Sequence, residues 1–257
     1  MEKKYLFFDI DGTLTDRSTG EIVPSAREAL TRLEENGHFV AIATGRAHYK
    51  ARKFTDANGF KNMVCCGGNG CVIDNELVEN IPLDKDGCIK IIHQAEKLGY
   101  GWCVALDDTK DVYMTDDKFL RQVGKRKEPT RYIIDDMLEV EKADAIYKVY
   151  VAIPKEDEEK LTTKELVGHL RFEPEYLMFQ PDNKRGGIIK MMEHLNADIK
   201  DVVVFGDDYN DMDMFCPEWF SIAMGNACQD LKDMASYVTD TNVNDGIKKA
   251  CEHFEWI

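Results

Sequence analysis

Residues 5–13 read YLFFDIDGT, an apolar run that ends abruptly at Asp9 and is followed by a second carboxylate and a glycine. A short, fully buried parallel strand has this pattern. Because side chains alternate along an extended chain, Asp9 and Asp11 fall on the same side of Ile10. Two carboxylates at this spacing can divide the work of attack or metal binding and of proton transfer. A solvated Asp-Gly turn without any chemistry has the same local pattern.

The next segments continue the strand into a βαβ unit. Ser25, three residues before Glu28, predicts a capping box, and apolar residues then recur at helical spacing as far as Asn36-Gly37. A second apolar run, residues 39–43, ends at Thr44-Gly45-Arg46. The first 46 residues therefore predict strand, helix and strand, the beginning of an α/β domain.

A strongly apolar run late in the chain, residues 202–205, ends at Gly206-Asp207-Asp208. Ligands of open parallel sheets bind beyond the carboxyl ends of the strands. We therefore expect four polar clusters to meet at one sheet edge. Their convergence is stronger evidence for a ligand site than any single cluster. The clusters are Asp9/Asp11, Thr44/Arg46, the region of Lys184, and Asp207/Asp211.

Each cluster also has a plain structural interpretation. The carboxylates of Asp207, Asp208 and Asp211 suit Mg²⁺, but they could simply cap the next helix. Thr44 offers a hydroxyl and a helix start to an anion, but it could be an ordinary N-cap. Lys184 opposes the dipole at a predicted helix start, which suggests phosphate binding, although an exposed lysine is the alternative and Arg185 is a rival.

The middle of the chain has a different character and predicts a separate α+β module. Helices are expected near residues 88–98 and 156–167, and strands at residues 101–106, 112–114, 148–153 and 176–179. We place this inserted domain at residues 83–180. The α/β core then comprises residues 1–82 and 181–257, with a hairpin whose tip is Asp74-Asn75.

The overall composition excludes several classes of protein. The 257 residues carry a formal net charge of −15, which disfavours binding to nucleic acid or to an anionic membrane. The eight cysteines contain no CxxC pair, so reduced cysteines in a cytoplasmic protein are expected rather than a zinc site or disulfides. No apolar run is long enough to span a membrane, and the first residues are too short for a signal peptide.

Taken together, the motifs resemble those of the haloacid dehalogenase (HAD) superfamily of phosphohydrolases. Its four motifs are matched in order by Asp9-Ile10-Asp11-Gly12-Thr13, Thr44, Lys184, and Gly206-Asp207-Asp208 with Asp211. The resemblance is closest to the Cof-type branch, subclass IIB with a C2-type cap. Further matches to that branch are Thr44-Gly45-Arg46, Asn69-Gly70, Asn210, Met224-Gly225-Asn226-Ala227, Asn242 and Asp245-Gly246. One departure is Arg185, where the branch often has glycine after the lysine.

The resemblance implies a Rossmann-like core with an inserted cap, and it implies roles for residues. Asp9 would attack phosphorus, and Asp11 would protonate the leaving alcohol and then activate water. Mg²⁺ would be held by Asp9, the backbone carbonyl of Asp11 and Asp207, with support from Asp208 and Asp211. Substrate or its phosphate would be bound by Thr44, Gly45, Arg46, Lys184, Asn210 and Asn69, although Asn69-Gly70 is also an ordinary turn sequence.

The expected function is a Mg²⁺-dependent phosphatase that acts on a small phosphorylated metabolite, with a sugar phosphate as the favoured class. A phosphomutase on sugar phosphates and a non-catalytic binding protein with the same fold are the alternatives. In the cap, Trp102, Tyr113, His169 and the basic run 125–127 could face a substrate, but each could equally be core or surface. The sequence does not indicate an oligomeric state.

Overall fold

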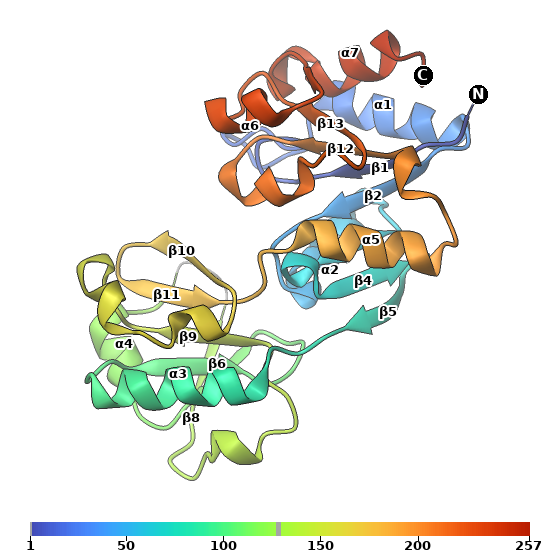
Figure 1. The fold of residues 1–257 in the computed structure, drawn as a ribbon. Helices are drawn as coiled ribbons and strands as arrows, with labels where there is room; N and C mark the ends of the chain where they lie inside the picture. The colour runs from blue at the N-terminus through green and yellow to red at the C-terminus, as the bar shows by residue number, and fades with distance from the viewer. Residues whose placement is uncertain (1, 127–129) are drawn as a thin grey trace. The chain divides into compact units, whose positions relative to one another are not determined.

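The computed structural model describes residues 2–126 and 130–257, and all structural statements below concern these residues. The chain divides into two compact units. The first comprises residues 1–46, 53–79 and 183–257, and the second comprises residues 47–52 and 80–182. Figure 1 shows each unit built around its own sheet.

The first unit is an α/β domain with a mostly parallel sheet, as the sequence predicted. Its strand order is β14-β13-β12-β1-β2-β3-β4-β5. The strands from β14 to β3 are parallel, and β4 returns antiparallel to β3. The strands are β1 (Tyr5–Phe8), β2 (Phe39–Ala43), β3 (Met63–Cys65), β4 (Gly70–Ile73), β5 (Glu76–Asn80), β12 (Val202–Gly206), β13 (Phe220–Ala223) and β14 (Tyr237–Val238).

Helices cover this sheet because alternate strand residues are buried on each face. Phe7 of β1 and Val204 of β12 share one core with Ile188 and Met191 of α5. Helices α1 and α7 pack together and are tied by an ion pair between Lys248 and Glu28 (Figure 1). The helices of this unit are α1 (Pro24–Glu35), α2 (His48–Asn58, whose first residues belong to the second unit), α5 (Lys184–His194), α6 (Gln229–Met234) and α7 (Gly246–His253).

The start of α1 differs from the prediction. The helix begins at Pro24, its N-cap is Val23, and no side chain caps it, so the capping box of Ser25 and Glu28 was wrong. Proline suits the first helical position because its fixed φ is helical and its missing N–H would have no partner there. Ser25 then lies inside the first turn and cannot act as the cap. The hairpin tip was predicted correctly, since Asp74 and Asn75 both have positive φ between β4 and β5.

The second unit is an α+β module with a six-stranded sheet in the order β10-β11-β9-β6-β7-β8. Residues of β6 alternate between two cores, with Trp102 and Val104 on the side of α3, and Cys103 and Ala105 on the other side with Phe119 of α4. Its elements are α3 (Lys85–Lys97), β6 (Trp102–Ala105), β7 (Asp111–Met114), α4 (Lys118–Val123), β8 (Arg131–Ile134), β9 (Lys148–Val151), β10 (His169–Glu173) and β11 (Tyr176–Phe179).

The predicted helix at residues 156–167 is absent. Two 3₁₀ turns, Lys155–Lys160 and Lys164–Leu166, take its place. The segment carries a run of adjacent acidic residues, and of its side chains Leu161 and Val167 are buried. It therefore has no apolar stripe with the 3.6-residue period that would hold an α-helix against the sheet. The sequence analysis also did not identify α4, β8 or β10.

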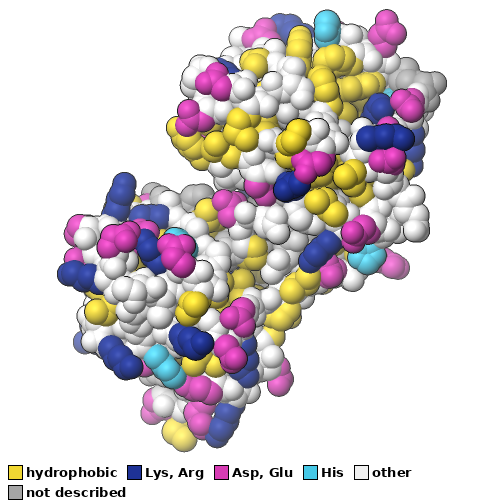
Figure 2. Space-filling model, viewed as in Figure 1, with side chains coloured by type: hydrophobic (Ala, Val, Ile, Leu, Met, Phe, Trp, Pro, Cys, Tyr) yellow, Lys and Arg dark blue, Asp and Glu magenta, His cyan; other side chains and the backbone are white. Residues whose placement is uncertain are grey.

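The surface of each unit carries charges of both signs. On the face shown in Figure 2, acidic and basic side chains are interspersed, so the net charge of −15 is not gathered into one patch on that face. Among the described residues, none of the helices combines the length and apolar character that a bilayer crossing requires.

Candidate active site

Three neighbouring parallel strands bring the predicted polar clusters to one edge of the first unit's sheet. Strands β12, β1 and β2 lie side by side, and they end just before Asp207, Asp9 and Thr44. The backbone N–H of Asp9 continues the ladder by donating to the carbonyl of Phe205 over 3.1 Å. Because the strands are parallel, their carboxyl ends meet at this edge, where ligands of such sheets bind.

Lys184 lies between two of the carboxylates. Its Nζ donates to Oδ1 of Asp9 over 2.8 Å and to Oδ1 of Asp211 over 2.6 Å. Its side chain is only 1% exposed, and both carboxylates are also buried. Lys184 is the first residue of α5, whose N-cap Asn183 accepts from the N–H of Gly186. Lys184 is therefore a buried lysine paired with two carboxylates, and the alternative of an exposed surface lysine is wrong.

The side chain of Arg185 pairs with a residue other than these carboxylates. Its guanidinium pairs with Glu218, and its backbone N–H donates to Asp213 over 2.9 Å. Of the two basic residues that the sequence could not separate, Lys184 is therefore the one that contacts Asp9.

The buried carboxylates of this site repel one another. Burial, the charge of Asp211 and a smaller effect of Asp207 raise the pKa of Asp9 to about 7, against the opposing effect of Lys184. Burial and the charge of Asp211 likewise raise the pKa of Asp207 to about 6, although Arg17 acts in the other direction. Burial alone would lower the pKa of Lys184, but the charges of Asp211 and Asp9 outweigh it and raise that pKa.

Asp9, Asp207 and Asp211 form a cluster that could hold a metal ion. One ligand oxygen from each lies within 4.8 Å of the others. Asp208 and Asp211 also cap the following 3₁₀ turn (Tyr209–Met214): Asp208 accepts from the N–H of Tyr209, and Asp211 Oδ2 accepts from the N–H groups of Asp207 and Asp208. The capping interpretation therefore holds for these two residues. It does not exclude a metal, because an oxygen of Asp211 still lies within 4.8 Å of oxygens of Asp9 and Asp207.

Asp11 lies outside this cluster of carboxylates. Its side chain is 65% exposed, and both of its oxygens accept from Nη2 of Arg46, over 2.7 and 2.8 Å. Thr44 is buried, and its hydroxyl accepts from the N–H of Arg46 over 3.2 Å. Arg46 thus joins the ends of β1 and β2. The assignment of the Asp11 backbone carbonyl as a metal ligand stays a prediction.

The remaining predicted binding residues lie in the loops around this edge. Gly45 connects Thr44 to Arg46, Asn69 ends the 3₁₀ turn that follows β3, and Asn210 lies in the turn after Asp208. All three are half-buried. Their contacts with a substrate stay predictions.

The cap residues that the sequence singled out have local partners within the second unit. Trp102 is buried and donates from Nε1 to Glu96, and His169 packs against Phe179. Tyr113 packs against the core on the α3 side, and the guanidinium of Arg126 lies 3.8 Å from the ring centre of Tyr150. Lys125 is exposed, and Lys127 lies outside the described residues.

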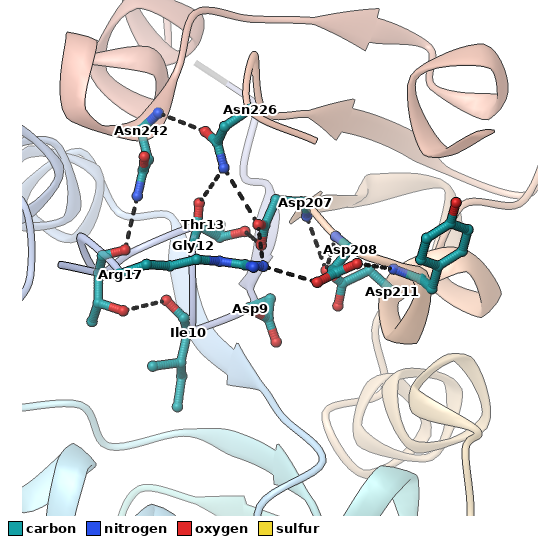
Figure 3. Close-up of polar contacts among 12 residues, drawn as sticks. Asp9, Ile10, Gly12, Thr13, Arg17, Asp207, Asp208, Asp211, Asn226 and Asn242 are labelled. Carbon is teal, nitrogen blue, oxygen red and sulfur yellow. Dashed lines mark hydrogen bonds and ion pairs between the residues drawn. The ribbon is translucent and has the colours of Figure 1, made fainter. Parts of the chain in front are cut away.

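A network that the sequence analysis did not assign surrounds Asp207 (Figure 3). Thr13 donates to Oδ1 of Asp207 over 3.0 Å, and Arg17 donates to its Oδ2 over 2.8 Å. Asn226 Nδ2 donates to the carbonyl of Gly12 over 2.9 Å and to Oδ2 of Asp207 over 3.3 Å. Asn226 also accepts from the N–H of Asn242. The sequence contained Asn226 and Asn242 only as matches to a family pattern, without a role.

Replacing Asn226 should destabilise the protein. In Asn226→Ala the carbonyl of Gly12 and the N–H of Asn242 lose a partner, and unsatisfied polar groups of this kind cost about 1–3 kcal/mol. Urea unfolding should show a loss of that size in the free energy of unfolding. Asn36→Ala is a matched control because Asn36 is exposed and donates once, to the carbonyl of Trp256. An equal or smaller loss in Asn226→Ala than in Asn36→Ala would contradict the network.

A family profile, curated relatives and a solved structure all point to the same kind of protein. A profile described as haloacid dehalogenase-like hydrolase matches residues 6–251. The protein YkrA of Bacillus subtilis is 29% identical over 97% of each chain. The pyridoxal phosphate phosphatase YbhA of Escherichia coli is 27% identical over 96% of this chain and 97% of its own. The solved structure of the HAD subclass IIB sugar phosphatase BT4131 is 26% identical, with a TM-score of 0.78 over 99% of this chain and 100% of that one.

Proposed function

Because the chain belongs to the haloacid dehalogenase-like hydrolase family, we propose that it is a Mg²⁺-dependent phosphatase that hydrolyses a small phosphorylated metabolite through a phosphoryl group carried on Asp9. The family and the phosphatases among its relatives make it a phosphoric monoester hydrolase. The observation that carries the proposal is the buried Lys184 held between Asp9 and Asp211, next to Asp207 and at the carboxyl end of the central strands.

Asp9 is the proposed nucleophile. It follows the central strand β1 directly, and its buried carboxylate is held by Lys184 through Oδ1. A carboxylate and a phosphate dianion repel each other, so attack requires positive charge around both. Lys184 supplies one such charge without any rearrangement. In the first step an oxygen of Asp9 bonds to phosphorus while the bond from phosphorus to the leaving alcohol oxygen breaks.

Asp11 is the proposed proton carrier. An alkoxide is a poor leaving group, so the departing oxygen needs a proton, which Asp11 donates. In the second step Asp11 takes a proton from water, the water oxygen bonds to phosphorus, and the acyl–phosphate bond to Asp9 breaks. The products are inorganic phosphate and the two restored side chains. Arg46, which holds both oxygens of Asp11, would orient it for these transfers.

The donor set fits the Mg²⁺ that the family implies. Asp9, Asp207 and Asp211 supply hard carboxylate oxygens, which this ion prefers. Burial and repulsion between these carboxylates raise the pKa of Asp9 to about 7 and that of Asp207 to about 6. A cation among them would relieve that repulsion. When bound, Mg²⁺ would neutralise charge on a phosphoryl group. Asp9 and Asp207 would hold it, Asp211 would support it, and Thr44 and Lys184 would hold phosphate oxygens.

We favour a sugar phosphate as the substrate. The likeness to the sugar phosphatase BT4131 supports this class, whereas the likeness to YbhA, a pyridoxal phosphate phosphatase, supports a vitamin phosphate at similar identity. The two are therefore to be compared directly. The core site does not distinguish them, since in this mechanism its described residues act on the phosphoryl group and on the leaving oxygen, which both substrates have.

A panel of sugar phosphates, nucleotides and vitamin phosphates tests the proposal. We expect phosphate release with Mg²⁺, loss of release with EDTA, and recovery when excess Mg²⁺ is restored. Arg185→Gln should remain active because Arg185 pairs with Glu218, whereas the basic residue bonded to Asp9 is Lys184. Failure to release phosphate from any compound would contradict the phosphatase. Conversion of a sugar phosphate into its isomer without free phosphate would show a mutase instead.

A further inference from the structure

Arg17 reaches the proposed metal site from the loop that follows β1. Its Nη2 donates to Oδ2 of Asp207 over 2.8 Å and to Oδ2 of Asp208 over 2.9 Å. Figure 3 shows the extended side chain lying across the site toward these two carboxylates. The Arg17 side chain is 57% exposed, whereas that of Asp207 is 2% exposed. An arginine that approaches from solvent therefore neutralises a carboxylate that the fold has buried.

We propose that Arg17 is a resident counter-ion that competes with Mg²⁺ for Asp207, and so sets the metal affinity of the site. This inference rests on the proposed function, because Asp207 must be a metal ligand. Arg17 occupies Oδ2 of Asp207, which also receives a longer contact from Asn226, while Oδ1 is held by Thr13. A cation that binds Asp207 must therefore share an oxygen with one of these donors or displace it.

Of these donors, Arg17 is the one that can leave at least cost. Thr13 is buried, and Asn226 is tied to Gly12 and Asn242 as well. Arg17 is held to the carboxylates by its exposed guanidinium, so water can solvate it when it moves away. Its flexible stem allows this motion without a change in the backbone.

The charges of the site favour the same conclusion. Four carboxylates meet here, those of Asp9, Asp207, Asp208 and Asp211, and among the described residues the cations paired with them are Lys184 and Arg17. Lys184 is buried between Asp9 and Asp211 and cannot leave without exposing them. Arg17 is therefore the positive charge whose removal leaves the acidic cluster intact but more negative. A divalent ion then meets less repulsion and one competitor fewer.

The test is direct measurement of Mg²⁺ binding by calorimetry to the phosphate-free protein, with no substrate present. Arg17→Gln should bind Mg²⁺ about tenfold more tightly than the wild type, the size expected for one partly exposed charge next to the ion. Arg17→Lys keeps the charge and should stay within about threefold of the wild type. Arg27→Gln is the matched control, because this substitution changes the net charge by the same amount. Arg27 is an exposed arginine whose guanidinium donates to Asn58 on α2.

A second readout separates competition from a change in folding. Without metal, Arg17→Gln should melt at a lower temperature than the wild type, because Asp207 and Asp208 lose their counter-ion. With saturating Mg²⁺ the two melting temperatures should converge. Unchanged or weaker Mg²⁺ binding by Arg17→Gln would overturn the inference, and it would leave the proposed function standing if the wild type still releases phosphate with Mg²⁺. If the wild type binds no Mg²⁺, both the competition and the metal site are wrong.

Discussion

Asp9→Asn is expected to lower phosphate release by at least about 10⁴-fold, because an amide cannot form the covalent bond to phosphorus that the mechanism requires. The replacement is nearly isosteric, and its amide oxygen can still accept from Lys184 Nζ, which lies 2.8 Å from Oδ1 in the wild type. The loss should therefore appear in kcat rather than in folding. Phosphate release under saturating substrate and Mg²⁺ measures it.

The stability of the same variant provides its control. Asp9 has an ordinary pKa of 3.8 and a pKa of about 7 in the fold, so the folded protein binds a proton more tightly than the unfolded chain. The contribution of Asp9 to the stability of the metal-free wild type should therefore fall as the pH rises from about 4 to about 7. Asp9→Asn should weaken this dependence and unfold no earlier than the wild type at pH 7. Substantial phosphate release by a well-folded Asp9→Asn protein would contradict the role of Asp9.

Of the variants proposed here, Lys184→Met is expected to lower the free energy of unfolding the most. Lys184 is 1% exposed, and its Nζ is bonded to both Asp9 and Asp211. Removing one partner of a buried ion pair leaves an uncompensated charge, which costs about 3–5 kcal/mol. Denaturant unfolding of the metal-free protein should show this loss. Phosphate release should be lost as well, because the same Nζ is proposed to hold the phosphoryl group.

The pH dependence identifies the cause of this loss. Lys184 lowers the pKa of Asp9, so without it Asp9 binds a proton more tightly in the fold, and the destabilisation should be greater at pH 8 than at pH 5, where Asp9 is protonated in the fold. Lys190→Met is the matched control on the same helix, since Lys190 is 38% exposed and 3.6 Å from Glu79. It should cost less than about 1 kcal/mol. An equal cost in the two variants would contradict the buried ion-pair network.

The sheet and the convergence of the site could be predicted because their signals are local. Apolar runs that end in Asp9, Thr44 and Asp207 mark buried parallel strands, and parallel strands place their carboxyl ends at one edge. The hairpin tip at Asp74-Asn75 was equally local, because both residues tolerate positive φ.

The partners of the site residues could not be predicted in this way. Arg17 meets Asp207 across 190 residues, and Asn226 meets Gly12 across 214. Neither residue lies in a local pattern that would indicate its partner, so their positions follow only from the folded sheet. Lys184 and Arg185 are adjacent in the chain and similar in charge, and only the direction of each side chain from α5 separates them.

The errors in the predicted secondary structure also had physical causes. Pro24 took the first position of α1 and excluded the capping box of Ser25, which required the helix to start two residues later. In the second unit, the edge strands β8 and β10 carry charged residues, Arg131 in β8 and Arg171 and Glu173 in β10, which made them harder to recognise than the apolar central strands.

The most direct test of the central claim is to trap the phosphoryl group on Asp9. An aryl phosphate labelled in its phosphoryl group would be mixed with wild type and with Asp11→Asn in the presence of Mg²⁺, and quenched in acid. A phenolate leaves without a proton, whereas attack by water needs Asp11, so the label should accumulate on Asp11→Asn. We predict hydroxylamine-sensitive label on the peptide that contains Asp9, and none on Asp9→Asn. Release of the phenolate with no label on the protein, or with label on another peptide, would contradict the mechanism.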